Sequence, residues 1–225
     1  MKILWLLGPM ASGKTTQHKL LMELLGTGEI DVKNGCKEPQ PFCYSISGSI
    51  GSLGLLKEGV QTCGIDPVYG DLKKEGLRDS LEKLLHEKCD LVVMEGAQAS
   101  MEWYKQVVVP VRNYAEYYQF GEVELYVVHL AISFDHNLQR LRQRRWLKTH
   151  ETLEGFTGSN QMVLEDRTYE NVLGKNKQYR SLFKALQKLE EGGKEPVKLK
   201  TLEIDALLDR IEILEQIATF VYAED

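Results

Sequence analysis

Apolar and polar positions along this chain form two patterns, short apolar runs and longer segments in which apolar residues recur every three or four positions. The short runs predict strands at 3–7, 90–96, 123–132 and 199–204, with short strands or a hairpin at 42–47 and 49–56. The longer segments predict helices at 14–25, 73–87, 136–148, 179–189 and 206–222. A further helix is expected after Ser100, with an interruption at Pro110. This alternation predicts an α/β fold, with a five-stranded, mostly parallel sheet and helices on both faces.

The first predicted helix carries Leu20, Leu21, Leu24 and Leu25 at helical spacing, so this stripe is expected to face the core. His18 lies in the same helix. Neither His18 nor any of the other four histidines has a spacing typical of metal ligands or of a catalytic triad, so no role is assigned to them.

The segment between the first strand and the first helix reads Gly-Pro-Met-Ala-Ser-Gly-Lys-Thr and matches the phosphate-binding pattern G-x-x-x-x-G-K-[ST]. Its glycines permit backbone torsions that turn N–H groups toward phosphate oxygens, and the helix N-terminus that follows favours an anion. Lys14 is expected to reach the β- and γ-phosphates of ATP, and the Thr15 hydroxyl to bind Mg²⁺. The predicted nucleotide-binding residues are Gly8, Pro9, Met10, Ala11, Ser12, Gly13, Lys14, Thr15 and Thr16.

A carboxylate, Glu95, ends the apolar run at 90–96. Because the carboxyl ends of parallel strands meet at the edge where the phosphate loop lies, Glu95 is expected in the site. There it can hold a water molecule on Mg²⁺ or orient the acceptor hydroxyl, and it is predicted to be catalytic and, with Thr15, to serve the metal.

Arginines are concentrated in the helix predicted at 136–148. At about 100° per residue, Arg140 and Arg144 share one face, whereas Leu138 and Leu141 point toward the core. Two guanidinium groups on one face suit the charge that develops on the γ-phosphate, so both are predicted to be catalytic. A solvated helix face and contact with the phosphates of an acceptor remain the alternatives.

Two further carboxylates, Glu38 and Asp66, compete for a place on the acceptor side of the site. Each is followed by a proline, and turn chemistry alone would explain either. Asp66 is preferred as a catalytic residue because Tyr69 beside it suits stacking on a base. Which of Glu38, Asp66 and Glu95 is the base stays open.

Length, composition and charge narrow the expected domain organisation, location and partners. With 225 residues, of which 43% are hydrophobic and 27% charged, one domain over 1–225 is expected, with a basic lid region at about 136–160. No signal peptide or membrane span is predicted, and the four scattered cysteines suggest reduced thiols in a cytoplasm, that of the host if the protein is viral. The net charge of −5 argues against a generally basic nucleic-acid-binding surface, and the oligomeric state, a homodimer included, stays open.

The phosphate loop, the strand-end Glu95 and the helix that carries Arg140 and Arg144 together resemble P-loop kinases of nucleosides and nucleotides, thymidylate kinases among them. The resemblance implies the P-loop kinase fold, ATP as phosphate donor and Mg²⁺ as cofactor. It also implies that Glu95 is the base or a ligand of metal-bound water, and that Arg140 and Arg144 are lid arginines.

The chain departs from these kinases at two places. Gly96 stands where cellular deoxynucleoside kinases usually have an arginine, and 37–40 read Lys-Glu-Pro-Gln where thymidylate kinases have Arg-Glu-Pro-Gly. The glycine-rich hairpin followed by 62–66, together with Glu95-Gly96, is similar to the bacteriophage 5-hydroxymethyluracil DNA kinases. Those enzymes phosphorylate a hydroxymethyl group on a base already within DNA.

The sequence therefore predicts transfer of the ATP γ-phosphate to a pyrimidine-type acceptor, with 5-hydroxymethyluracil in DNA preferred. A base flipped out of the duplex would stack near Tyr69 or Trp103, and Arg142, Arg145 and Lys148 would contact the DNA backbone. A free deoxynucleoside or nucleoside monophosphate is the alternative acceptor. A P-loop ATPase that works as a conformational switch is the alternative from another class.

Overall fold

The computed structural model of this chain describes all residues except 27–30, 34–43, 54–72, 97–99, 157–165 and 224–225. The described part contains a seven-stranded sheet with the order β2-β3-β4-β5-β1-β6-β7. The neighbouring strands β4, β5, β1, β6 and β7 are all parallel, whereas β2 and β3 extend the sheet in antiparallel pairing. The strand bounds are Lys2–Leu7 (β1), Asp31–Lys33 (β2), Tyr44–Ser47 (β3), Ile50–Leu53 (β4), Leu91–Glu95 (β5), Glu124–Ala131 (β6) and Lys198–Asp205 (β7).

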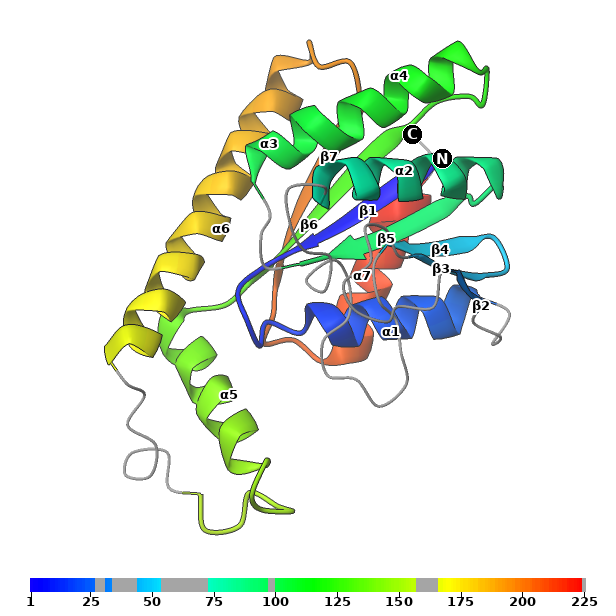
Figure 1. Cartoon of the computed structure of the whole chain (residues 1–225). Helices are drawn as coiled ribbons and strands as arrows, with labels where there is room; N and C mark the ends of the chain where they lie inside the picture. The colour runs from blue at the N-terminus through cyan, green and yellow to red at the C-terminus, as the bar shows by residue number, and fades with distance from the viewer. Residues whose placement is uncertain (27–30, 34–43, 54–72, 97–99, 157–165, 224–225) are drawn as a thin grey trace.

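Helices cover both faces of the sheet, and α5 projects from its carboxyl edge beside the first turns of α6 (Figure 1). A π-helical turn, η1, at Tyr104–Val108 joins α3 to α4 without a break. The helix bounds are Lys14–Leu25 (α1), Lys73–His86 (α2), Met101–Trp103 (α3), Val109–Tyr117 (α4), Phe134–Trp146 (α5), Asp166–Gly192 (α6) and Arg210–Tyr222 (α7). No described helix is both long enough and apolar enough to cross a membrane.

Successive residues of β1 point to opposite faces of the sheet and enter two different hydrophobic clusters. Ile3, Trp5 and Leu7 pack with residues of α2, α4 and α6, whereas Leu4 and Leu6 pack with residues of α1 and α7. All five side chains are fully buried. Two apolar layers thus hold β1 in the middle of the sheet, and the loop that follows it starts from a fixed point.

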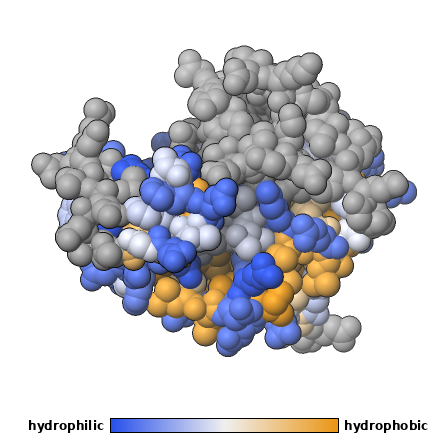
Figure 2. Space-filling view, turned by 90° about the horizontal axis from the view of Figure 1, so that it is seen from below, coloured by the Kyte–Doolittle hydropathy of each residue, from blue (hydrophilic) through white to orange (hydrophobic). Residues whose placement is uncertain are grey.

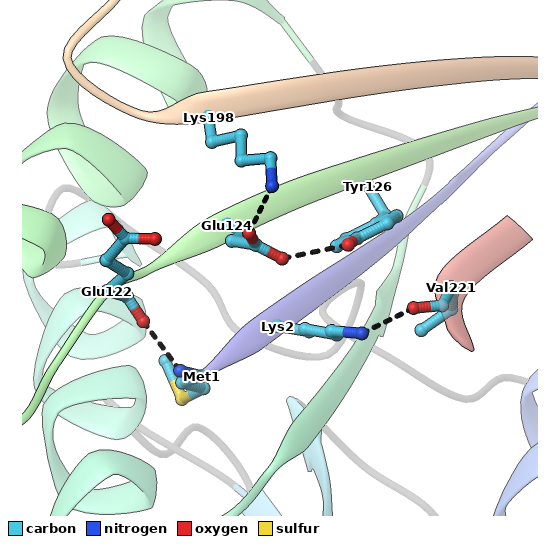
Figure 3. A network of polar contacts seen from close by, with 7 residues as sticks. All are labelled: Met1, Lys2, Glu122, Glu124, Tyr126, Lys198 and Val221. Carbon is cyan, nitrogen blue, oxygen red and sulfur yellow. Dashed lines mark hydrogen bonds and ion pairs between the residues drawn. The ribbon is translucent and has the colours of Figure 1, made fainter. Parts of the chain in front are cut away.

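The N-terminus of the chain is attached to the amino ends of the strands (Figure 3). The Met1 amino group donates to the Glu122 carbonyl at 2.7 Å, and burial lowers its pKa despite nearby carboxylates. The Lys2 ammonium donates to the Val221 carbonyl in the last turn of α7 at 2.6 Å. It also lies 5.5 Å from the centre of the Tyr126 ring, so one cation stabilises both a helix C-terminus and a strand.

A second set of contacts at this end surrounds Glu124 (Figure 3). Its two carboxylate oxygens meet the Lys198 ammonium at 3.0 Å and the Tyr126 hydroxyl at 2.8 Å. Burial alone would raise the pKa of Glu124, but the hydrogen bonds from Lys198 and Tyr126 and the charges of Lys198 and Lys2 together lower it. These contacts tie β6 to β7 across the start of the sheet.

The α/β fold and the mostly parallel sheet are confirmed, with the phosphate loop at the carboxyl end of a central strand. The predicted hairpin is present as β3 and β4. The prediction of five strands was wrong, because the described sheet has seven. The missed strand β2 has only three residues, too few for a hydrophobic pattern to indicate it.

Two helix predictions need correction. Pro110 does not interrupt the helix after Ser100, because the Val109 N–H bonds to the Tyr104 carbonyl in the wider π-helical turn and the chain continues into α4. The helix expected at 179–189 is the second half of α6, which begins at Asp166. Its first half carries more polar residues and lacked a clear apolar stripe.

The start of α7 and the buried face of α1 also differ from expectation. The last helix begins at Arg210, not at 206, because the Asp209 carboxylate caps it by accepting from the Ile211 N–H at 2.8 Å. In α1 the buried face includes His18 and Leu21, whereas Leu24 is 61% exposed. The buried face is formed by Gln17, His18, Leu21 and Met22, so Leu24 lies on a different side of the helix.

Candidate active site

The loop after β1 has the backbone of a phosphate cradle. Gly8 has a φ of +148°, and a Cβ at this position would lie 2.6 Å from the Ser12 Oγ and 2.9 Å from the Leu130 carbonyl oxygen. Gly13 has a φ of +98°, and Ala11 at the turn of the loop also has a positive φ of 61°. Only glycine fits position 8, and the three left-handed residues curl the chain into a tight loop.

The loop ends in the N-terminus of α1, where no side chain caps the helix. The Lys14 ammonium folds back over the loop and donates to the Gly8 carbonyl at 2.8 Å and the Pro9 carbonyl at 2.9 Å. It lies 5.8 Å from the centre of the Tyr179 ring of α6. A cation above a curled loop and the uncapped amides of a helix N-terminus both favour a bound anion.

The residues of this loop fit the phosphates of a nucleoside triphosphate. A side chain at position 8 would collide with Ser12 and the Leu130 carbonyl, so glycine is needed for the curled backbone that turns amides toward a phosphate. The Ser12 Oγ is buried and has no hydrogen-bond partner among the described residues, so it can accept or donate one more bond. Thr15 is half-buried at the start of α1, and its hydroxyl suits a divalent cation beside the phosphates.

A cavity of about 760 Å³ adjoins this loop. Its volume is within the range of small-ligand sites. It lies between the loop, the arginines of α5 and the connection from β7 to α7. Hydrophilic and hydrophobic surfaces are interspersed on the face of the molecule that is seen from below (Figure 2). The described residues that line the cavity beyond the loop are Gln17, Arg140, Arg144, Ala206, Leu207, Leu208, Asp209, Arg210 and Ile213.

Both predicted arginines of α5 line this cavity. The Arg140 guanidinium donates to the Ala206 carbonyl at 2.8 Å and, more weakly, to the Ala11 carbonyl at 3.4 Å. Arg144, one turn later, is exposed. Arg140 therefore joins the phosphate loop to the β7–α7 connection, while Arg144 lines the cavity with an exposed side chain.

Asn137 is a site residue that the sequence analysis missed. It is fully buried, and its amide donates to the Met10 carbonyl at the turn of the phosphate loop. Its side-chain oxygen accepts from the Asn176 amide of α6 at 3.1 Å. A polar chain thus runs from α6 through α5 to the loop. An asparagine in the first turn of a polar helix carries no signal that distinguishes it from a solvated one.

Glu95 lies apart from the cavity. It ends β5 in register with Leu6, and its side chain is 2% exposed. It is not among the described residues that line the cavity. Its carboxylate lies 3.8 Å from the Nδ1 of His18, and the next residue, Gly96, accepts a hydrogen bond from the Tyr179 hydroxyl at 3.1 Å.

A second buried histidine, His129, lies on β6 near the loop. Its Nδ1 lies 2.9 Å from a Glu203 carboxylate oxygen of β7. Burial lowers the pKa of His129, the Glu203 contact raises it, and the charges of Arg180 and Lys14 lower it further. The net effect is a lowered pKa, which favours an uncharged ring beside the Lys14 cation.

The structure brings together the loop residues from Gly8 to Thr16, Arg140 and Arg144. Asp66, Glu38 and Tyr69 lie outside the described residues. Within the described part of the chain, no group of three or more histidine, cysteine, aspartate or glutamate side chains could hold a metal ion. A divalent cation here would therefore depend on the Thr15 hydroxyl, water and the phosphates themselves.

Comparison with solved structures finds the deoxyadenosine kinase of M. mycoides with bound dATP, at 14% identity and a TM-score of 0.40. The match covers 97% of this chain and 98% of that one. No family model and no curated protein matches the sequence.

Proposed function

We propose that this chain is a P-loop kinase that transfers the γ-phosphate of ATP to a hydroxyl group of a pyrimidine-type acceptor. The observation that carries the proposal is the loop from Gly8 to Thr15, a curled backbone with Lys14 above it and an uncapped helix N-terminus behind it. The adjoining cavity, with two arginines on its wall, gives room for a nucleotide.

The proposed reaction joins the acceptor oxygen to the γ-phosphorus and breaks the bond from that phosphorus to the β–γ bridging oxygen, which leaves with ADP. The acceptor proton passes to a carboxylate, for which Glu95 is the described candidate. Lys14 and the loop amides bind the phosphates, and Arg144 stabilises the charge that develops on them. Mg²⁺, held by Thr15, would neutralise part of that charge.

The preferred acceptor is 5-hydroxymethyluracil within DNA, supported by the resemblance of 62–66 and Glu95-Gly96 and by the cations of α5. This helix projects from the carboxyl edge of the sheet (Figure 1). Lys148, just beyond its end, is exposed. A local basic strip can bind a few backbone phosphates despite the overall charge of −5. A free deoxynucleoside or nucleoside monophosphate is the second candidate.

The deciding experiment follows label from γ-phosphate-labelled ATP into matched acceptors. These are thymidine, thymidylate, a thymine-containing duplex and the same duplex with 5-hydroxymethyluracil. We expect label only in the hydroxymethylated duplex. Label in thymidine or thymidylate alone would replace the acceptor but keep the kinase. Rapid ATP hydrolysis without any acceptor, and no labelled acceptor, would contradict the kinase and favour an ATPase switch.

The DNA acceptor has a further signature in its salt dependence. Because phosphate contacts release counterions, phosphorylation of DNA should weaken as salt rises, and Arg145→Gln with Lys148→Gln should reduce the logarithmic slope by about two. Lys184→Gln, at an exposed position of α6, is the matched control and should leave the slope unchanged. An unchanged slope in the double variant would remove α5 from the DNA contact.

A further inference from the structure

A row of three polar side chains crosses the interface between α1 and the sheet. His18 comes from α1, Ser52 from β4 and Glu95 from the end of the neighbouring strand β5. Their residues are 0%, 0% and 2% exposed. They lie in an otherwise apolar layer that includes Leu21 and Met22 of the same helix. Polar groups buried to this degree need partners or a function to explain them.

The contacts in this row hold the His18 ring in one orientation. The Ser52 Oγ lies 2.8 Å from the Nε2 of His18, a hydrogen bond that a flip of the ring would break. The opposite ring nitrogen, Nδ1, lies 3.8 Å from a carboxylate oxygen of Glu95. Ser52 therefore fixes the ring so that Nδ1 faces Glu95.

The contact between His18 and Glu95 is incomplete. Its length of 3.8 Å exceeds that of a hydrogen bond, and neither the His18 Nδ1 nor the Glu95 Oε1 has a hydrogen-bond partner among the described residues. A buried polar atom without a partner lowers the stability of the folded protein. A purely structural histidine would be expected to have both nitrogens bonded. In catalytic sites, hydrogen bonds that are long in the free protein often shorten to normal length when substrate binds.

The surroundings of the His18 ring indicate which of its two nitrogens carries the proton. A carboxylate opposite Nδ1 accepts but does not donate, which favours the proton on Nδ1. Nε2 is then the acceptor, and the Ser52 hydroxyl donates to it. The order Ser52, His18, Glu95 is that of a hydrolase triad, but Ser52 pairs with Val93 and so lies deeper in the sheet than Glu95, which ends β5 at the carboxyl edge.

We propose that His18 is a positioning residue that orients the Glu95 carboxylate through its Nδ1–H, and that Ser52 in turn fixes the His18 ring. This inference rests on the proposed kinase function, in which Glu95 takes the proton of the acceptor hydroxyl. α1 also carries the phosphate-binding residues Lys14 and Thr15 at its start. The same helix therefore binds the donor phosphates and orients the carboxylate on the acceptor side.

Two substitutions at position 18 separate its two contacts. In His18→Asn the side-chain amide can replace Nδ1 and donate to Glu95, whereas in His18→Gln it replaces Nε2 and reaches Ser52 only. We expect His18→Gln to lower kcat about tenfold with the KM for ATP within about twofold, and His18→Asn to keep kcat within about threefold of wild type. Met22→Leu, buried in the same helix face, is the control for packing and should leave kcat unchanged.

A spectroscopic measurement tests the geometry without turnover. The ¹⁵N chemical shifts of the His18 ring, assigned by their loss in His18→Gln, should show the Nδ1–H tautomer in the folded protein. Ser52→Ala should weaken that preference, and Glu95→Gln should shift the Nδ1 resonance. An Nε2–H tautomer in the wild-type protein would overturn the inference.

The outcomes distinguish this inference from the function on which it rests. If the wild-type protein phosphorylates no acceptor, the kinase proposal fails and the role of His18 fails with it. Suppose instead that the wild type is active and Glu95→Gln is inactive. If His18→Gln and His18→Asn then lose equal kcat and equal unfolding free energy, His18 has only a packing role. That result would overturn this inference but leave the kinase proposal intact. Rescue of kcat by His18→Asn would support the inference.

Discussion

At the amino ends of the parallel strands, charged groups meet partners at hydrogen-bond distance, whereas at the carboxyl ends several buried polar atoms have none among the described residues. Lys2 bonds to the end of α7, and Glu124 bonds to both a lysine and a tyrosine. At the opposite end, the Ser12 Oγ, the His18 Nδ1 and the Glu95 Oε1 are buried without a hydrogen bond. One sheet thus has an end where these charged groups are satisfied by the protein, and an end where three buried polar atoms lack a partner among the described residues.

The difference predicts opposite effects of mutation at the two ends. Polar contacts that are complete in the free protein contribute to the free energy of unfolding. Unpartnered polar groups lower stability and are retained where they act on a substrate. Substitutions at the carboxyl end should therefore change turnover more than stability, and substitutions at the amino end should do the reverse.

The largest effect is expected for Lys14→Ala. Its ammonium lies over the phosphate loop and outside the two hydrophobic clusters, so its loss removes charge from the reacting phosphates without opening the core. Turnover should fall on the order of a hundredfold or more. The free energy of unfolding should fall by no more than about 2 kcal/mol, because the hydrogen bonds to the Gly8 and Pro9 carbonyls are lost. Near-normal turnover in a folded Lys14→Ala protein would rule out the site.

A smaller loss of turnover is expected for the double change Arg140→Ala and Arg144→Ala. Both side chains line the cavity, and Arg140 also joins the phosphate loop to the β7–α7 connection. Turnover should fall about tenfold to a hundredfold, with a higher KM for ATP because the loop loses this connection. Steady-state kinetics of the two single variants separates the effects, with Arg144→Ala expected to act mainly on kcat. If Arg144→Ala changed only the affinity for ATP and left kcat unchanged, Arg144 would be a binding residue and not a catalytic one.

Lys2→Met should reverse this pattern. The substitution keeps the length of the side chain but removes the hydrogen bond to the Val221 carbonyl and the cation beside the Tyr126 ring. The protein should lose about 1–2 kcal/mol of unfolding free energy in a urea titration. Turnover per folded molecule should match that of the wild type. A selective loss of turnover would show that the two ends are coupled and would break the comparison.

The two ends also differ in what the sequence could predict. The strand β1, the phosphate loop and α1 are predictable because a local pattern specifies them. This pattern is an apolar run followed by Gly8, Gly13 and Lys14. The roles of His18 and Asn137 depend on contacts with Ser52 and Asn176, distant in the chain. No spacing within one segment could indicate such contacts, since they arise only when helices and strands pack. The pattern of residues along the chain therefore indicates no role for His18 or Asn137.

The smallest effect is expected in the pH dependence of stability around Glu124. Its pKa in the folded protein lies below its ordinary value of 4.5, because the contacts of Lys198 and Tyr126 outweigh the effect of burial. A carboxyl group whose pKa is lowered by folding stabilises the protein above the unfolded pKa, and this contribution is lost as the pH falls through the folded pKa. The wild-type protein should therefore lose stability on acidification below about pH 5.

Glu124→Gln tests this sign directly, because glutamine keeps the size of the side chain and does not titrate. At neutral pH the variant should be less stable than the wild type by no more than about 1 kcal/mol, since the Lys198 partner is half-exposed to solvent. The difference should shrink as the pH falls below about 4, where the wild-type carboxylate takes up its proton. Urea titrations at neutral and acidic pH measure it, with turnover as the control that should not change. A difference that grows on acidification would mean that Glu124 opposes folding, and the amino end of the sheet would then not be the fully satisfied end.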